Sequence, residues 1–154
     1  MKADSSIFID TNILVYSIDK DSPYHQETRD LIDKIDNRQV LACVSPQILG
    51  EFYSTITNPK KIKKPLTPNE AVEIVEGFLE ADTVKKIYPT ETTFTITLDL
   101  VRRYQIKALD FFDAYIVATM LDNGVRKIYT ANDKDFKIFK EIEVITPLKV
   151  ISTG

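Results

Sequence analysis

The sequence predicts an α/β fold in which helices cover both faces of a central parallel sheet. Short apolar runs alternate with segments of helical period along the chain, an order typical of strands joined by crossover helices. The first run, Ile7, Phe8 and Ile9, has no polar alternation, as expected of a strand buried on both sides. In such folds, binding sites collect at the carboxyl edge of the sheet, so the residues after each strand are the first candidates for function.

The expected elements follow one another in regular order. The expected strands are residues 6–9, 40–45, 84–88, 127–130 and 144–146. The expected helices, in which apolar side chains recur at helical spacing, are residues 24–35, 46–56, 68–79, 94–104 and 111–121, with a further helical stretch over 13–17. Ser22, Ser45 and Thr67 each stand before a proline, which predicts a capping side chain followed by proline in the first turn of a helix.

Length and composition indicate one globular domain over residues 1–154. The chain has 154 residues, of which 44% are hydrophobic and 28% charged, so it can bury a core without disulfides or structural metals. No apolar run is long enough to cross a bilayer, and the N-terminal residues lack the apolar stretch of an export signal. We therefore expect a cytoplasmic protein with no membrane contact. The single cysteine, Cys43, stands in an apolar stretch and is expected to be a buried, inert thiol.

The net charge says little about partners. The formal net charge is −3 and the isoelectric point is near 5.2, whereas a nucleic-acid-binding protein usually has a basic face. Carboxylates that hold metal ions count as negative in this sum, although their site is closer to neutral once ions are bound. The charge therefore does not exclude a nucleic-acid substrate.

Acidic residues follow the first expected strand and stand on two of the expected helices. Asp10 comes directly after residues 7–9 and is either the cap of the next helix or a site residue. Glu51 flanks the apolar stripe of its helix and is either solvated or functional. Asp110 can cap the helix over 111–121, and Asp113 stands at its third position, where acids suit the positive helix end. Because Asp113 has apolar neighbours, it needs a partner if it is buried.

A further polar turn follows the expected strand 127–130. It contains Asn132, Asp133 and Asp135, which are common turn residues and also lie at the carboxyl edge of the sheet. Together with the acids above, this turn predicts a cluster of carboxylates at one edge.

Other kinds of catalytic site have little support in the sequence. There is one histidine, His25, in a polar stretch where we expect it at the surface, so a cysteine–histidine pair or a histidine-rich zinc site is not indicated. No Walker motif or GxGxxG motif is present, and the chain has only four glycines. Carboxylates without histidine suit hard cations such as Mg²⁺ or Mn²⁺, which activate water and hold a phosphate. The pattern therefore favours phosphodiester hydrolysis.

Four segments in order resemble the motifs of PIN domains. Residues 7–16 resemble the opening motif, residues 45–53 the second motif, residues 110–119 the third and residues 129–136 the fourth. Each motif is degenerate, but four in the right order over essentially the whole chain are fairly specific. The resemblance implies a PIN-like three-layer α/β/α sandwich with a central parallel sheet.

The resemblance also implies an activity and partners. PIN domains of this size are often VapC-like ribonuclease toxins of type II toxin–antitoxin systems. The chain is then expected to be a Mg²⁺- or Mn²⁺-dependent endoribonuclease that cleaves RNA, is inhibited by a cognate antitoxin protein and forms a homodimer. Two alternatives stay open: a PIN-domain nuclease that acts in RNA processing, and a catalytically impaired PIN-fold binding module.

The resemblance assigns roles to individual residues. Asp10 and Asp113 match the best metal ligands, and Glu51 matches the third acid. The fourth place is filled either by Asn132, where many relatives carry aspartate, or by Asp135. A neutral Asn132 is the feature that favours the impaired module. Thr11 is expected to orient the substrate or Asp10 through its hydroxyl.

Two groups of basic residues are candidates for phosphate contacts. The denser group is a run of four lysines between two prolines, which is either a substrate contact or a solvated loop: Lys60, Lys61, Lys63 and Lys64. The other group is either a second contact or the exposed face of a helix: Arg102, Arg103 and Lys107.

Overall fold

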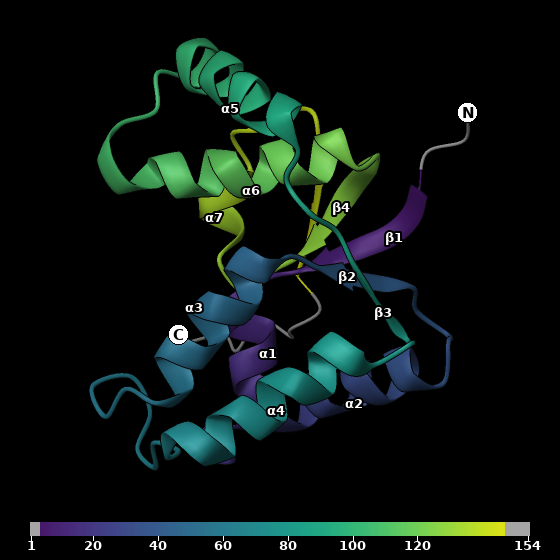
Figure 1. Ribbon diagram of the computed structural model, residues 1–154, viewed down its shortest axis with the longest axis vertical. Helices are drawn as coiled ribbons and strands as arrows, with labels where there is room; N and C mark the ends of the chain where they lie inside the picture. The colour runs from purple at the N-terminus through teal and green to yellow at the C-terminus, as the bar shows by residue number, and fades with distance from the viewer. Residues whose placement is uncertain (1–3, 147–154) are drawn as a thin grey trace, which may run out of the picture.

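The computed structural model describes residues 4–146 and has the predicted α/β architecture around a five-stranded sheet (Figure 1). The strands are β1 (Asp4–Ile9), β2 (Ala42–Val44), β3 (Val84–Lys86), β4 (Val125–Tyr129) and β5 (Glu143–Ile145). Their order in the sheet is β3-β2-β1-β4-β5, and every pair is parallel. The expected strands are therefore confirmed, with ends that shift by up to two residues.

The strand order creates a switch point beside β1. From β1 the chain moves outward to β2 and β3, and it then crosses to β4 on the other side of β1. Phe8 pairs with Cys43 of β2, and Ile9 pairs with Tyr129 of β4. In an open parallel sheet, the crevice that binds ligands lies at the carboxyl ends of the two strands where the direction of winding reverses. Here those strands are β1 and β4.

Helices cover both faces of the sheet, as the sequence predicts. They are α1 (Thr11–Ile18), α2 (His25–Asp36), α3 (Pro46–Ile56), α4 (Pro68–Glu80), α5 (Glu91–Tyr104), α6 (Phe111–Asp122) and the short α7 (Asp133–Phe136). Figure 1 shows α5 and α6 on one side of the sheet and α2 and α4 on the other. This arrangement gives the three layers of an α/β/α sandwich. Within residues 4–146, no helix is long and apolar enough to span a bilayer.

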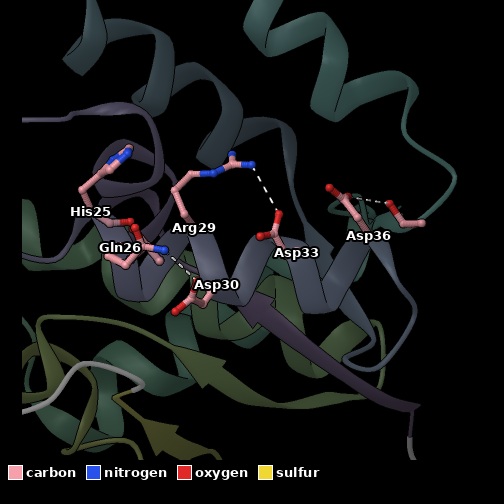
Figure 2. Close-up of polar contacts among 8 residues, drawn as sticks. His25, Gln26, Arg29, Asp30, Asp33 and Asp36 are labelled. Atoms are coloured by element: carbon pink, nitrogen blue, oxygen red, sulfur yellow. Dashed lines mark hydrogen bonds and ion pairs between the residues drawn. The ribbon is translucent and has the colours of Figure 1, made fainter.

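Helices α6 and α2 differ in how much of their surface is buried. Helix α6 is apolar on nearly all sides, and Ala114 and Val117 are fully buried in it. By contrast, α2 has one polar face, on which Gln26 donates to Asp30 at 2.9 Å (Figure 2). The predicted buried thiol, Cys43, is 0% exposed.

Two threonines fix the end of α6 relative to α5. The carboxylate of Asp122, the last residue of α6, accepts from the hydroxyl of Thr90 at 2.5 Å and from that of Thr93 at 2.7 Å. Thr90 and Thr93 also form the capping box that starts α5. One carboxylate therefore ties the start of α5 to the end of α6.

Only one of the three predicted serine or threonine caps is formed. Thr67 makes the full capping box of α4 with Glu70. Ser45 stands at the cap position of α3 but makes no cap hydrogen bond. Ser22 does not cap α2 because its hydroxyl accepts from the amide of Tyr24 at 3.1 Å in a turn that precedes the helix. The predictions for Ser22 and Ser45 were wrong, since proline position alone does not show where a hydroxyl points.

The predicted cap at Asp110 is also absent. A short 3-10 helix over Ala108–Asp110 runs directly into α6, so Asp110 already has helical backbone angles and makes no side-chain cap bond. The turn that contains Asp133 and Asp135 is likewise helical, because it forms α7. Both differences lie at the carboxyl edge of the sheet.

Helix α3 is anchored by the residue that follows Glu51. Phe52 is 0% exposed and packs edge-on against Phe78 of α4, with ring centroids 5.6 Å apart. We expect Phe52→Ala to lower the free energy of unfolding by about 3–5 kcal/mol, because it removes a buried ring and leaves a cavity. Denaturant unfolding measures this change. Phe112→Ala, at a ring that is 51% exposed, is the control and should change stability much less.

Candidate active site

The predicted acids meet in one pocket at the switch point of the sheet. A pocket of about 400 Å³ lies at the carboxyl ends of β1 and β4. Its lining includes all four predicted carboxylates: Asp10, Glu51, Asp113 and Asp135. They come from the end of β1, from α3, from α6 and from α7, so segments far apart in the sequence build the pocket. The structure therefore brings together the acids that the sequence identified one by one.

Asp10 is the most buried of these acids. It is 8% exposed, and its Oδ1 accepts from the backbone N–H of Thr11 at 2.8 Å. Its Oδ2 accepts from the hydroxyl of Thr130 at 2.7 Å and from Nδ2 of Asn12 at 3.3 Å. Burial raises the pKa of Asp10, because the loss of solvent outweighs the hydrogen bonds from Thr130 and Thr11. The carboxylate of Asp10 contacts the first turn of α1, as a cap does, and it also lines the pocket.

Glu51 is held by two donors at the mouth of the pocket. The hydroxyl of Thr11 donates to Oε2 at 3.1 Å, and Nε2 of Gln47, one helical turn earlier, donates to Oε1 at 3.4 Å. Thr11 thus orients Asp10 through its backbone N–H and Glu51 through its hydroxyl. The expectation that the hydroxyl orients Asp10 was wrong, because in the first turn of α1 that hydroxyl faces α3.

Asp113 has the clearest electrostatic perturbation in the pocket. Its carboxyl group is half-buried in the first turn of α6. Desolvation, followed by repulsion from Asp135 and Asp10, raises the pKa of Asp113 to about 7. A carboxyl group whose pKa is raised by burial and by neighbouring acids is poised to bind a cation, which would offset the repulsion.

Both candidates for the fourth place line the pocket. Asn132 precedes α7, and its backbone N–H donates to the hydroxyl of Thr130 at 3.0 Å. Asp135 lies on α7, and its charge contributes to the raised pKa values of Asp10 and Asp113. A carboxylate is therefore available at this corner even though residue 132 is an amide.

The four lysines of the α3–α4 loop are not equivalent. Lys61 lines the pocket, whereas Lys60, Lys63 and Lys64 are absent from its lining among the described residues. The loop is fixed by the neighbouring Ile62, which is only 8% exposed. Burial of Ile62 in the middle of the run separates Lys61 from the lysines after it. Lys61 is therefore the lysine of this loop that shares the pocket with the acids and is the candidate for a substrate contact.

The basic residues at the end of α5 also separate. Arg102 pairs with Asp99 on the same helix, and Arg103 pairs with Glu141. Both arginines are exposed, and their ion pairs lie at the protein surface. Lys107 instead lines a second cavity beside the acids.

Sequence reasoning missed two residues that position Asp10. Thr130 follows β4 and is 0% exposed, and Asn12 lies on α1. Besides contacting Asp10, Asn12 accepts from the backbone N–H of Ala131 at 3.1 Å and so links α1 to the end of β4. The signal that identifies Thr130 is the strand order, because Ile9 and Tyr129 are paired and the residues after them must be neighbours.

The donor set of the pocket fits Mg²⁺ or Mn²⁺. Within residues 4–146, no three histidine, cysteine or acidic side chains are drawn together closely enough to enclose an ion by themselves. Mg²⁺ does not require such a cage, since it usually keeps several waters and is held by one or two carboxylates. Asp10 and Asp113 could supply these ligands, with Glu51 and Asp135 reaching the outer waters. All four are hard oxygen donors, as these cations prefer.

The raised pKa of Asp113 predicts a pH-dependent contribution to stability. The folded state binds the proton more tightly than the unfolded state, so stability is lost as pH rises from about 4, the ordinary carboxyl range, through about 7. We expect Asp113→Asn to flatten this loss and to raise the melting temperature relative to the parent at pH 8. Thermal melts across pH 4–8 measure the effect. Asp99→Asn, at an exposed acid on α5, is the control and should leave the profile unchanged.

Comparison with known proteins agrees with this architecture. A model of the PIN domain family matches residues 7–142. Ribonuclease VapC24 of Mycobacterium tuberculosis is 27% identical over 140 residues, which cover 91% of this chain and 95% of that protein. Ribonuclease VapC43 of the same organism is 24% identical over 140 residues, which cover 91% and 94%.

Solved structures share the fold at lower sequence identity. The crystal structure of VapC20 from M. tuberculosis, described as a sarcin–ricin loop cleaving toxin, superposes with a TM-score of 0.66 at 16% identity, over 87% of this chain and 95% of that one. A toxin–antitoxin complex from Klebsiella pneumoniae gives 0.62 at 20% identity, over 94% and 100%. The chain thus belongs to the PIN domain family and is homologous to the VapC ribonucleases of toxin–antitoxin systems.

Proposed function

We propose that this protein is a metal-dependent endoribonuclease that hydrolyses RNA phosphodiester bonds and is the toxin of a type II toxin–antitoxin pair. The observation that carries the proposal is the convergence of four carboxylates on one pocket at the switch point of the sheet. Two of these groups have raised pKa values, chiefly because burial desolvates them and partly because neighbouring acids repel them. Such a site suits a divalent cation and a phosphate.

Asp10 and Asp113 are the proposed holders of Mg²⁺ or Mn²⁺. Asp10 is fixed by Thr130, Asn12 and Thr11, so its carboxylate is pre-oriented before any ligand arrives. The bound cation supplies a more acidic water and offsets the charge of the phosphate. Because both carboxylates come from rigid elements, the distance between them is set by the packing of α6 against the sheet.

Glu51 is the proposed proton acceptor for the attacking water. Its two oxygens already accept from Thr11 and Gln47, which directs the remaining lone pairs toward the pocket. Attack on phosphorus in line with the 3′ oxygen breaks the P–O3′ bond and leaves a 5′ phosphate. Lys61, at the rim of the same pocket, is placed to contact a phosphate of the strand.

The toxin assignment has support from the relatives. Similar structures include VapBC from Salmonella typhimurium bound to DNA and VapBC2 from Rickettsia felis bound to a fragment of its promoter. By analogy, a cognate antitoxin protein is the proposed partner of this chain, and a homodimer is its proposed assembly.

A second candidate, a binding module with an impaired site, is favoured by the neutral side chain of Asn132. The carboxylate of Asp135 in the same pocket weighs against it.

The first test is RNA cleavage by aspartate variants. Asp113→Asn should reduce Mg²⁺-dependent cleavage of RNA by at least about a hundredfold, because it removes a proposed cation ligand, and Asp135→Asn should reduce it by about 10–100-fold, the usual cost of losing a residue behind the ligands. The readout is the initial rate on a gel with labelled RNA. Asp133→Asn is the matched control, because Asp133 also lies on α7 but pairs with Lys137 outside the pocket. Undiminished cleavage by both pocket variants would sink the proposal.

The second test is metal binding, which separates a nuclease from an impaired module. Calorimetric titration with Mn²⁺ should show binding that strengthens as pH rises through about 7, because Asp113 must lose its proton to become a ligand. Asp113→Asn should weaken binding and remove this pH dependence. A parent chain that takes up no Mn²⁺ at pH 8 would favour the binding module.

A further inference from the structure

A second cavity adjoins the acidic pocket. It has a volume of about 300 Å³, and Asp113 and Asp135 line both spaces. The two cavities therefore meet at carboxylates that the proposed reaction uses. A chain-like ligand held at those carboxylates would have the second cavity beside it.

Two lysines from different elements line this second cavity. Lys107 lies between α5 and α6, and Lys134 lies on α7 next to Asp135. Both side chains belong to exposed residues, so their ammonium groups are free to reach an anion. The acids of this cavity are Asp110, Asp113 and Asp135, of which the last two are the carboxylates that also face the cation site.

The backbone on either side of Lys107 has an unusual shape. Gln105 has φ of 53° and Ala108 has φ of 52°, which are left-handed values that residues other than glycine seldom adopt. Gln105 ends α5, and its Nε2 donates to the carbonyl of Arg102 at 2.7 Å. Lys107 is extended between these two left-handed residues. The segment is therefore fixed in a shape that presents Lys107 at the cavity.

The other side of the cavity is apolar. Tyr104, Ile106, Ile138 and Phe139 contribute to its lining. The ring of Tyr104 packs edge-on against Phe139, and its hydroxyl donates to Glu141 at 2.6 Å. Ile138 remains 48% exposed. The cavity thus combines a rigid apolar wall with two cationic side chains.

We propose that this second cavity binds one nucleotide of the RNA strand, adjacent to the phosphate that is cleaved. Lys107 and Lys134 contact its phosphate, and the wall formed by Tyr104, Ile106 and Ile138 receives its base. The inference rests on the proposed nuclease function, because the strand enters from the acidic pocket. Sites for single-stranded nucleic acid commonly pair cationic groups for the backbone with apolar or aromatic surfaces for the bases.

The chemistry of the cavity favours a nucleotide over simpler ligands. A small inorganic anion does not need an apolar wall, and an apolar ligand does not need two lysines. In a strand, the phosphate charge is separated from an uncharged base, which matches the separation of lysines and apolar residues here.

Salt dependence of RNA binding tests the lysine contacts. Each protein carries Asp113→Asn so that the RNA stays intact, and binding of a short fluorescein-labelled single-stranded RNA of mixed sequence is followed by anisotropy in Mg²⁺. Lys107→Ala and Lys134→Ala should each lower the slope of log K against log [salt] by about 0.7, the value for one phosphate contact on a single strand. Lys34→Ala is the control, because Lys34 lies in the last turn of α2, before the amino end of β2. Slopes equal to that of the control overturn the lysine contacts.

A second pair of variants tests the apolar wall. Ile138→Ser should weaken RNA binding several-fold at every salt concentration and leave the slope unchanged, because a base contact releases no counterions. Leu41→Ser is the matched control, since Leu41 is 52% exposed and precedes β2 at the opposite edge of the sheet. Equal binding by Ile138→Ser and Leu41→Ser overturns the base contact.

The two proposals fail in different ways. If the parent chain leaves RNA intact in Mg²⁺, the nuclease assignment fails, and the binding experiment can then be run on the parent itself. If the parent cleaves RNA but the variants at Lys107 and Lys134 keep the control slope, only the nucleotide cavity is rejected.

Discussion

The carboxylate of Asp10 is buried at the junction of β1 and β4, and the arrangement of the pocket depends on how it is held there. Three groups from two sides donate to it: the backbone of Thr11, the amide of Asn12 and the hydroxyl of Thr130. The contact from Thr130 exists only because β1 and β4 are neighbours in the sheet, whereas those from Thr11 and Asn12 are local to the start of α1. A buried carboxylate with several donors keeps one orientation, so the acids around it face a fixed reference point.

The other acids of the pocket lie close enough to Asp10 for their negative charges to repel one another. Asp113 and Asp135 share the pocket with Asp10 although Asp135 helps to raise the pKa of both other groups, and hydrophobic packing elsewhere holds them there. Helix α6 carries Asp113 in its first turn and buries Ala114 and residues 116–120 in the core. Different parts of α6 therefore have different roles. The buried part contributes stability, and the first turn adds negative charge to the pocket.

The sequence predicted the sheet and the acids because both depend on local pattern. Apolar runs, helical spacing and the residue after each strand are readable one segment at a time. The contacts that orient the acids depend on strand order, and strand order cannot be read from any single segment of the sequence. Thr130 becomes visible as a partner of Asp10 only when β4 is known to lie beside β1, and the Thr11 hydroxyl reaches Glu51 only because α1 packs on α3. Hydroxyl direction also explains why Ser22 and Ser45 failed as caps.

The strand order also determines how much of the chain must be present before a site exists. Thr130 and Asp10 are 120 residues apart in sequence. The central strand β1 has β4 as one of its two neighbours, and β4 comes late in the chain. Contacts of this separation form late in folding, since a long loop must close first. An incomplete chain emerging from a ribosome holds Asp10 and Glu51 before Thr130, which orients Asp10, and before Asp113 and Asp135, which complete the pocket. A protein with this topology stays without a complete site during most of its own synthesis.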